Sequence, residues 1–214
     1  MLFEFKAEFV QNRDDYFERI CANKKVLHIG ACDAPYTLKK HEQGLLLHEK
    51  LNRVCSEIIG VDIDDKAICI MEGLGYKDIV RFDMNRINEL DFVPDVIVFG
   101  ETIEHLMNTE VALTNIKKIM SENCKLLIST PNAFYLNNFF HALKNQENAH
   151  EDHKHYFTPQ TLKQLLEANR LHAEKVIFTF LNRESESFKN KMVKRLTRHF
   201  PMLAETLVFQ CKLQ

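Results

Sequence analysis

Short runs of apolar residues alternate with longer amphipathic segments along most of the chain. Short apolar runs are typical of buried strands, and apolar residues repeated at helical spacing indicate helices. The expected strands lie at 26–29, 58–61, 78–82, 96–99 and 126–129, and the expected helices at 37–54, at 66–74, from 108 or 109 onward, and at 158–166. Short strands that alternate with helices favour parallel pairing, with helices on both faces of the sheet. The pattern therefore predicts an α/β fold.

The two ends of the chain extend this plan. Apolar residues at near-helical spacing between Lys6 and Ala22 predict an N-terminal amphipathic helix. Two more strands are expected at 176–180 and 206–211, on either side of a basic helical segment. A length of 214 residues suits one domain better than two. We expect a single domain, 1–214, with the N-terminal helix in 1–23, a core in 24–181, and the basic segment and last strand in 182–214.

Composition places the chain among globular proteins. Hydrophobic residues make up 45% and charged residues 27%, with 6 Gly and 5 Pro, which excludes collagen-like and wholly disordered chains. A formal net charge of -2 argues against a surface devoted to polyanions. The cysteines form no C-x-x-C pair, which disfavours a zinc knuckle and favours a reducing compartment. The opening residues do not resemble a signal peptide, and no apolar run approaches about 18 residues, so we expect a soluble, cytoplasmic protein.

Each of the first five expected strands ends at or just before a residue that can address a ligand. These residues are Gly30, Asp62, Asp83, Glu101 and Asn132. In open parallel sheets, ligands bind in the crevice outside the carboxyl ends of the strands. The five residues are therefore expected to converge on one site, although they are widely separated in sequence.

The turn after the first of these strands constrains the ligand. Gly30 lacks a side chain, so the backbone there can turn sharply and approach a ligand closely. It is followed by Ala31 and Cys32 rather than by further glycines, so the dinucleotide pattern G-x-G-x-x-G is not met. Asp62 also lies beyond the usual distance of about 20 residues after such glycines. An NAD-dependent oxidoreductase is therefore disfavoured.

Two carboxylates suit the two ends of a nucleoside. Asp62 can accept hydrogen bonds from both hydroxyls of a ribose, and Asp83 can accept one from the amino group of adenine. Ile63 and Met84 stand beside them in sequence and offer apolar walls for the base. A carboxylate after a strand is also a common turn former or helix cap, and this alternative remains open for each residue.

In order and spacing, these motifs resemble those of the class I S-adenosylmethionine-dependent methyltransferases. The matching segments are KKVLHIGACDAPYT, IIGVDID, RFDMN, DVIVFGETIEHL and KLLISTPNAF, within about residues 24–181. The resemblance implies a Rossmann-like, seven-stranded, mostly parallel sheet whose last strand is antiparallel. It also implies S-adenosylmethionine as cofactor, with contacts from Gly30, Ala31, Cys32, Asp62, Ile63, Asp83, Met84 and Glu101.

The chain departs from the usual pattern of this family in its first motif. His28 stands where the family usually carries an acid, and Cys32 and Ala34 stand where it carries further glycines. These differences suggest altered placement of the amino-acid end of the cofactor. A non-catalytic module that binds S-adenosylmethionine without transferring its methyl group is therefore kept as an alternative.

The segment after the fourth strand of the family pattern suggests a metal site. On a helix starting near Glu101, the side chains of Glu101, Glu104 and His105 would share one face, and His153 could supply a fourth ligand. The two carboxylates and one nitrogen of the first three residues suit Mg²⁺ or Mn²⁺ better than Zn²⁺. The pattern resembles metal-using methyltransferases of two kinds, which modify the terminal 2′-hydroxyl of small RNAs or catechol-like ubiquinone precursors. The E-H-L ending also occurs in relatives not known to need metal.

Methyl transfer to a hydroxyl group is also accessible without a metal. A general base with a pKa near neutrality can remove the hydroxyl proton. His153 is our first candidate for this base and His105 the second. Other histidines, His141, His150 and His155, lie close to His153 in sequence, so the assignment among them stays open.

The methyl acceptor is the least constrained part of the prediction. Residues 132–155 mix aromatic side chains with amides and histidines, which suits stacking on a sugar ring and hydrogen bonding to its hydroxyls, although the aromatic residues also fit a packed helix. The carboxyl-terminal layout resembles methyltransferases of bacterial surface-polysaccharide pathways. A sugar or another small hydroxylated molecule is the leading acceptor. An RNA 3′-terminal 2′-O-methyltransferase is the alternative, and the lack of basic excess disfavours a nucleic-acid partner.

Overall fold

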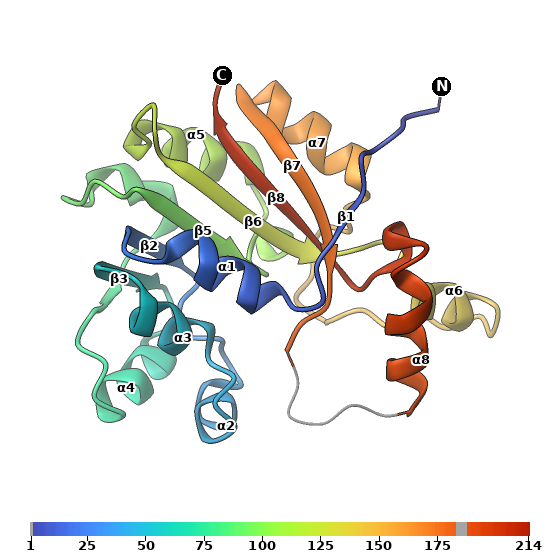
Figure 1. Cartoon of the computed structure of the whole chain (residues 1–214). Coiled ribbons are helices and arrows are strands. Elements are labelled where there is room, and N and C mark those ends of the chain that lie inside the picture. Colours follow the sequence, from blue (N-terminus) through green and yellow to red (C-terminus); the bar gives the residue numbers. More distant parts are fainter. Residues whose placement is uncertain (1, 183–187) are drawn as a thin grey trace.

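One mixed sheet of eight strands forms the centre of the protein (Figure 1). The computed structural model describes residues 2–182 and 188–214. Within them the strand order is β1-β7-β8-β6-β5-β2-β3-β4, and β8 is antiparallel to both of its neighbours. The strands are β1 (Glu8–Phe9), β2 (Lys25–Ile29), β3 (Glu57–Asp62), β4 (Ile79–Arg81), β5 (Val96–Gly100), β6 (Lys125–Pro131), β7 (Leu171–Thr179) and β8 (Thr206–Leu213). The expected α/β class with an antiparallel last strand is confirmed.

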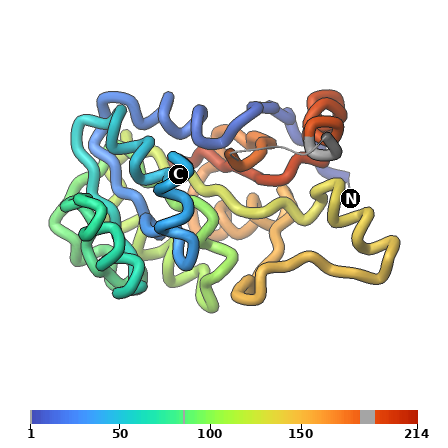
Figure 2. The backbone as a smooth tube through the Cα atoms, turned by 90° about the horizontal axis from the view of Figure 1, so that it is seen from below, coloured from blue at the N-terminus to red at the C-terminus, as the bar shows by residue number. Residues whose placement is uncertain are grey.

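Helices connect the strands and cover the sheet. The α-helices are α1 (Arg13–Cys21), α2 (Thr37–Glu42), α3 (Leu47–Val54), α4 (Asp65–Gly73), α5 (Thr109–Ile119), α6 (Leu136–Ala142), α7 (Pro159–Ala168) and α8 (Phe188–Thr197). Three short 3₁₀ helices are η1 (Met84–Glu89), η2 (Ile103–His105) and η3 (Pro201–Leu203). In Figure 2, α1 lies along one side of the sheet and the segment after β6 extends from one end of the molecule.

Alternate side chains of the central strand β2 point to opposite faces of the sheet. Val26 belongs to one core cluster with Tyr16 of α1 and Leu51 of α3. Leu27 belongs to the other core cluster with Leu113 of α5. Both faces of the strand are therefore buried, which is why β2 reads as an almost continuous apolar run in the sequence.

Local sequence determines where several helices begin. The side chain of Asn108 accepts a hydrogen bond of 3.2 Å from the backbone N–H of Val111, so Asn108 rather than Thr109 is the N-cap of α5. The Asp64 carboxylate caps α4 in the same way. Thr158 forms a capping box at the start of α7. These short polar side chains satisfy backbone N–H groups that have no partner inside the helix.

Three expectations about the elements need correction. The N-terminal helix is shorter than 1–23, because residues 8–9 pair with β7 as an edge strand and α1 starts only after its N-cap, Asn12. This added strand makes the sheet eight-stranded rather than seven-stranded. The helix expected at 37–54 is split into α2 and α3, with Gly44 between them at a φ of +65°. Glycine adopts this left-handed conformation readily, which ends the first helix.

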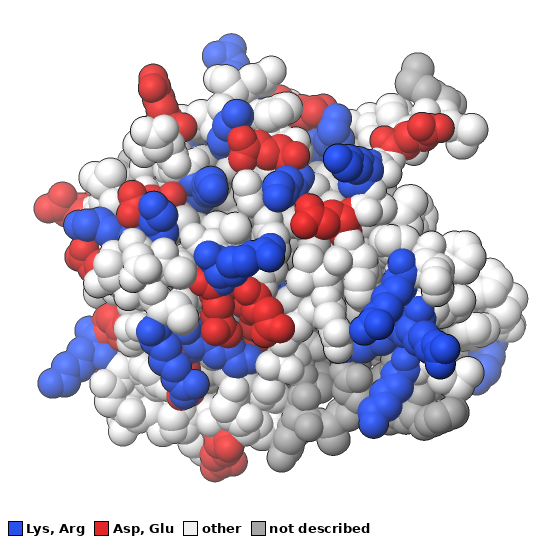
Figure 3. Space-filling model, in the orientation of Figure 1, with Lys and Arg blue, Asp and Glu red and all other residues white. Residues whose placement is uncertain are grey.

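The basic segment near the carboxyl end forms α8. Lys191, Arg195 and Arg198 are exposed there, while Val193 is buried. Figure 3 shows basic side chains gathered on this side of the molecule. Part of the segment named in the sequence analysis, residues 183–187, lies outside the described residues. Among the helices that are described, none combines the length and apolar character needed to cross a membrane.

The parallel strands end at one edge of the sheet. Ile29 of β2 pairs in register with Val61 of β3 and with Phe99 of β5, and Phe99 in turn pairs with Ile128 of β6. The residues that follow these positions therefore emerge side by side. This register is the reason why groups far apart in the sequence can line one cavity.

Candidate functional site

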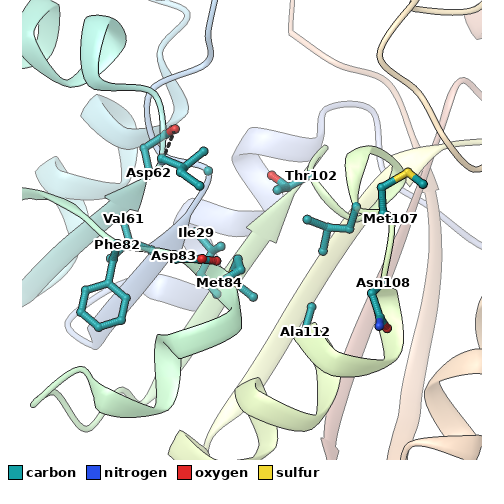
Figure 4. A pocket seen from close by; sticks show the side chains of 13 residues that line it. Ile29, Val61, Asp62, Phe82, Asp83, Met84, Thr102, Met107, Asn108 and Ala112 are labelled. Atoms are coloured by element: carbon teal, nitrogen blue, oxygen red, sulfur yellow. Dashed lines mark hydrogen bonds between the residues drawn. The ribbon is translucent and has the colours of Figure 1, made fainter.

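A cavity of about 290 Å³ lies at this edge of the sheet (Figure 4). In Figure 4, Asp62, Asp83 and Met84 lie on one side, and Thr102, Met107 and Asn108 on the other. The lining comes from the ends of β2 and β3, from the segments that follow β2, β3, β4 and β5, and from α5. It comprises Ile29, Gly30, Val61, Asp62, Ile63, Phe82, Asp83, Met84, Thr102, Leu106, Met107, Asn108 and Ala112.

Five of the eight residues expected to contact the cofactor line this first cavity. They are Gly30, Asp62, Ile63, Asp83 and Met84. Ala31 and Cys32 are instead fully buried behind the turn, in a core cluster with residues of α4. Glu101 does not line the first cavity but a second one. The sequence thus identified the groups around one cavity, whereas the side chains on its far wall, such as Leu106 and Met107, carried no recognisable signal.

The Asp62 carboxylate is held in place by backbone amides. Its Oδ2 accepts a hydrogen bond of 2.9 Å from the N–H of Cys32, and its Oδ1 accepts bonds of 2.8 and 3.1 Å from the N–H groups of Ile63 and Asp64. A carboxylate has about four acceptor positions. The three amides therefore leave room for a further donor from the cavity, such as a ligand hydroxyl group.

The role of Gly30 is to allow two loops to approach each other closely. Its φ is +73°, and a Cβ built on it would lie 2.4 Å from Oγ1 of Thr102. The N–H groups of Gly30 and Ala31 donate to the carbonyl of Val61, at 2.9 and 3.2 Å. The turn after β2 is thereby fixed against the end of β3.

Glu101 is located at the end of β5 in an unusual conformation. Its φ is +46°, a left-handed value that a residue other than glycine adopts only when its surroundings require it. Its backbone N–H donates to the carbonyl of Ser129 on β6 at 2.9 Å. Its Oε1 lies 3.6 Å from Nη1 of Arg13. Burial raises the pKa of Glu101, and the positive charge of Arg13 opposes that change.

Arg13 lies behind the site and contacts Glu101, and the sequence analysis did not identify it. Its side chain is only 8% exposed and donates hydrogen bonds to Asp14 and to the hydroxyl of Ser129. Burial opposes the charge of Arg13, but the carboxylates of Asp14 and Glu101 raise its pKa. An arginine at the start of an amphipathic helix usually faces solvent, so no local signal in the sequence distinguished this one.

The expected metal-ligand geometry of Glu101, Glu104 and His105 is not present. No α-helix starts at Glu101 in the described chain, because its left-handed φ interrupts the backbone and the 3₁₀ helix η2 follows. The i, i+3, i+4 face of an α-helix therefore does not form there. Glu101 is directed to Arg13, and its carboxylate is not part of the histidine cluster described next.

His153 does approach Glu104, as the sequence suggested. Nε2 of His153 lies 3.9 Å from Oε1 of Glu104, whose side chain is 1% exposed. The other carboxylate oxygen, Oε2, accepts a hydrogen bond of 3.1 Å from Thr130. Burial and the nearby charge of Glu101 raise the pKa of Glu104 well above its usual value.

Three histidines gather beside this carboxylate. One ring nitrogen from each of His105, His150 and His153 lies within 4.8 Å of the others. The sequence analysis selected His105 and His153 but did not assign His150 to the cluster. The spacing of His150 and His153 in the segment HEDH was the available signal, yet similar spacings occur in solvated loops.

A second cavity, of about 350 Å³, is lined by residues that come just after β5 and β6 and by the loop between α6 and α7. Thr102 lines the first cavity and its neighbour Glu101 lines the second. The polar lining of the second cavity comprises the amides Asn132, Asn138 and Asn148, the phenols Tyr135 and Tyr156, the imidazoles His150 and His153, and the carboxylates Glu101 and Glu205. The arrangement suits two ligands that meet at the end of β5.

Comparison with known proteins gives a family match. A family model described as a methyltransferase domain matches residues 6–175. No curated protein matches the chain significantly.

Solved structures share the fold at low sequence identity. An S-adenosylmethionine-dependent methyltransferase from Archaeoglobus fulgidus is 20% identical, with a TM-score of 0.59 over 92% of this chain and 90% of that one. A methyltransferase from Thermotoga maritima is 13% identical, with a TM-score of 0.64 over 94% and 87%. The N-methyltransferase NodS from Bradyrhizobium japonicum WM9, solved with S-adenosyl-L-homocysteine, is 14% identical, with a TM-score of 0.56 over 94% and 85%.

Proposed function

This chain belongs to the family of S-adenosylmethionine-dependent methyltransferases, and from that premise we propose that it methylates a hydroxyl group of a sugar or another small hydroxylated molecule. The observation that carries the proposal is the pair of cavities to which the consecutive residues Glu101 and Thr102, just after β5, each contribute. The first has the groups that an adenosine needs. The second is lined by amides, phenols and imidazoles, which match the hydroxyl groups and ring faces of a sugar.

The first cavity fits the cofactor. The Asp62 carboxylate retains an acceptor position for ribose hydroxyls, and its charge strengthens such bonds. Asp83 and Met84 lie on the same side of the cavity, where one can address the edge of adenine and the other its face. The absence of a side chain at Gly30 leaves the backbone of the turn accessible. When bound, S-adenosylmethionine supplies a methyl group that its sulfonium charge makes electrophilic.

The residues of the second cavity then have to orient an acceptor and accept its proton. Alignment of the reacting groups accounts for much of the rate in such transfers. His153 is our first candidate for the proton acceptor and His105 the second. Burial and the neighbouring His105 and His150 lower the pKa of His153 to about 4. Its imidazole is therefore neutral at neutral pH, but so low a pKa makes it a weaker base than the near-neutral one that the sequence analysis called for.

A transfer assay tests the proposal. Purified protein is incubated with S-adenosylmethionine and a panel of free sugars, nucleotide sugars, catechols, amines and a short RNA, and S-adenosyl-L-homocysteine is quantified. The proposal predicts release only with a hydroxylated small molecule, and mass spectrometry of the product should show one added methyl group on oxygen. His153→Ala should lower this rate about 100-fold while leaving cofactor affinity unchanged.

The other members of the panel decide between the alternatives. Methylation of the RNA terminus would favour the metal-dependent RNA 2′-O-methyltransferase, and methylation of an amine would replace oxygen by nitrogen as the acceptor. Tight cofactor binding without transfer to any acceptor would favour a non-catalytic binding module. We also propose a cytoplasmic location, which the scattered cysteines without a C-x-x-C pair favour.

A further inference from the structure

We propose that His105, His150 and His153, together with the carboxylate of Glu104, form a binding site for a divalent transition metal of the zinc class. One ring nitrogen of each histidine lies within 4.8 Å of the others. The ring centroid of His153 lies 4.7 Å from that of His105 and 5.3 Å from that of His150. The three imidazoles therefore surround a common point beside the second cavity.

The backbone holds the two segments that contribute these rings against each other. His105 is the last residue of η2, and His150 and His153 come from the loop between α6 and α7. The N–H groups of Lys154 and His155 donate to the carbonyl of Glu104, at 2.8 and 3.2 Å. The loop is thus bound to η2 next to the histidines, and the cluster does not depend on the side chains alone.

One ring nitrogen of His150 is already positioned by the protein. Its Nδ1 accepts a hydrogen bond of 3.3 Å from the backbone N–H of Asp152. The N–H of His153 donates to the carbonyl of His150 at 3.0 Å, which closes a turn between the two rings. In a neutral imidazole whose Nδ1 accepts a hydrogen bond, the proton sits on Nε2, so a metal would bind His150 at Nδ1 in place of the Asp152 N–H.

The Glu104 carboxylate provides the second, independent observation. Its side chain is 1% exposed, and one oxygen is satisfied by Thr130. The other oxygen, Oε1, is buried and has no hydrogen-bond partner in the described part of the chain. It lies 3.9 Å from Nε2 of His153 but outside the group of ring nitrogens that lie within 4.8 Å of one another, so the carboxylate would have to move to become a fourth ligand. Buried polar atoms nearly always have a partner, and a cation among the histidines would provide one here.

The ligand types identify the class of metal. Three imidazole nitrogens and one carboxylate oxygen suit zinc and its transition-metal neighbours, whereas Mg²⁺ and Ca²⁺ prefer oxygen ligands. This differs from the sequence-based expectation of Mg²⁺ or Mn²⁺, because Glu101 pairs with Arg13 and His150 takes its place. Bonds of about 2.0–2.1 Å to zinc would require the nitrogens to move closer together than they are now.

The position of the metal gives it a use in the proposed reaction. His150 and His153 line the second cavity, so an oxygen of the acceptor could complete the coordination shell. This use, unlike the metal site itself, rests on the proposed function. His153 would then be a ligand and not the proton acceptor, so the metal-bound and metal-free mechanisms exclude each other at this residue.

Metal binding can be measured without any acceptor. Protein freed of its purification tag is treated with a chelator, dialysed, and titrated with Co²⁺ by visible absorption and with Zn²⁺ by calorimetry. We expect about one equivalent to bind per chain, with the intense visible bands of tetrahedral Co²⁺. His150→Ala and, separately, Glu104→Gln should each weaken binding at least about tenfold. The matched control His172→Ala changes an exposed histidine on β7 and should bind as the unaltered chain does.

Each outcome decides the proposal. Circular dichroism and binding of S-adenosyl-L-homocysteine verify that the variants are folded. Glu104→Gln keeps the shape of the side chain and serves as the test if His150→Ala does not fold.

The metal site is overturned if the unaltered chain binds neither ion, or if the folded variants bind metal as well as the control does. A bound metal whose removal leaves methyl transfer unchanged would keep the site and exclude its catalytic use. If none of the acceptors is methylated, the proposed function is contradicted but the metal site is not.

Discussion

The backbone N–H of Cys32 donates a hydrogen bond of 2.9 Å to Oδ2 of Asp62, which joins the turn after β2 to the end of β3. The two residues are 30 positions apart in the chain. Cys32 itself is fully buried and does not line the first cavity, so its contribution comes through the backbone. The bond orients the carboxylate that we expect to bind the ribose.

Asp62→Asn should weaken cofactor binding. The amide keeps one acceptor oxygen but loses the negative charge, and hydrogen bonds to charged groups contribute about 1.5–3 kcal/mol. The dissociation constant of S-adenosyl-L-homocysteine, measured by calorimetry, should therefore rise by about ten- to a hundredfold. Asp65→Asn, on the exposed side of α4, is the matched control and should bind normally. An unaltered affinity of the Asp62 variant would remove this residue from the cofactor site.

Gly30→Ala should destabilise the fold and weaken cofactor binding. The new methyl group would meet Oγ1 of Thr102 at 2.4 Å, and the φ of +73° is strained for alanine. We expect a loss of about 1–3 kcal/mol in the free energy of unfolding, measured by urea denaturation. Gly73→Ala is the control, since a methyl group at that position would have no atom within 4 Å and the φ of Gly73 is not left-handed.

A double variant separates the two causes of this effect. Thr102→Ala combined with Gly30→Ala removes the steric contact but not the backbone strain. Partial recovery of stability is expected. Full recovery would show that strain contributes nothing, and the lack of any recovery would exclude the contact with Thr102 as a cause.

Arg13→Leu should be strongly destabilising. It leaves the carboxylates of Asp14 and Glu101 buried without their arginine, and breaking a buried ion pair from one side costs about 3–5 kcal/mol. Lys50 still contacts Asp14, so the decrease in the free energy of unfolding should be near the lower end of this range. Arg53→Leu removes an exposed cation on α3 and should change the free energy of unfolding by less than about 1 kcal/mol. Equal effects of the two substitutions would contradict the assigned role of Arg13.

Stability should fall in mild acid because of His28. This side chain is 1% exposed, and burial, together with His48 and Arg13, lowers its pKa well below 6.5. Below the unfolded pKa of about 6.5 the unfolded chain binds a proton that the folded chain does not, so the free energy of unfolding decreases as pH drops, by up to about 1.4 kcal/mol per pH unit. The decrease ends at the lowered folded pKa.

Denaturant titrations between about pH 7.5 and about pH 5.5 measure this slope. Nδ1 of His28 lies 3.2 Å from Nδ1 of His48. The substitution His28→Asn keeps a side chain that can form this hydrogen bond, but asparagine does not titrate. The variant should therefore show a flatter dependence on pH. His199→Asn, on the exposed surface, should keep the slope of the unaltered chain. A slope that is the same in all three proteins would mean that His28 is not its source.

The order of elements and much of the lining of the first cavity could be predicted from local patterns. Short apolar runs marked the central strands, and Asn108 and Thr158 marked the starts of α5 and α7. Gly30 and Asp62 were expected near each other because carboxyl ends of parallel strands share one edge. The edge strand at Glu8–Phe9 was missed, since two residues are too few to show a period.

The acceptor side of the site depended on packing between distant segments. The sequence by itself indicated that Glu101, Glu104 and several histidines would lie near one edge of the sheet, because local hydrophobic runs mark the strand ends and the carboxyl ends of parallel strands share one edge. Only the tertiary structure decided that Glu101 faces Arg13 and that His150 joins His105 and His153. These contacts depend on a left-handed backbone conformation at Glu101 and on a loop whose N–H groups bind the carbonyl of Glu104. Neither feature produces a periodic pattern of hydrophobic and polar residues, so neither can be recognised in the sequence.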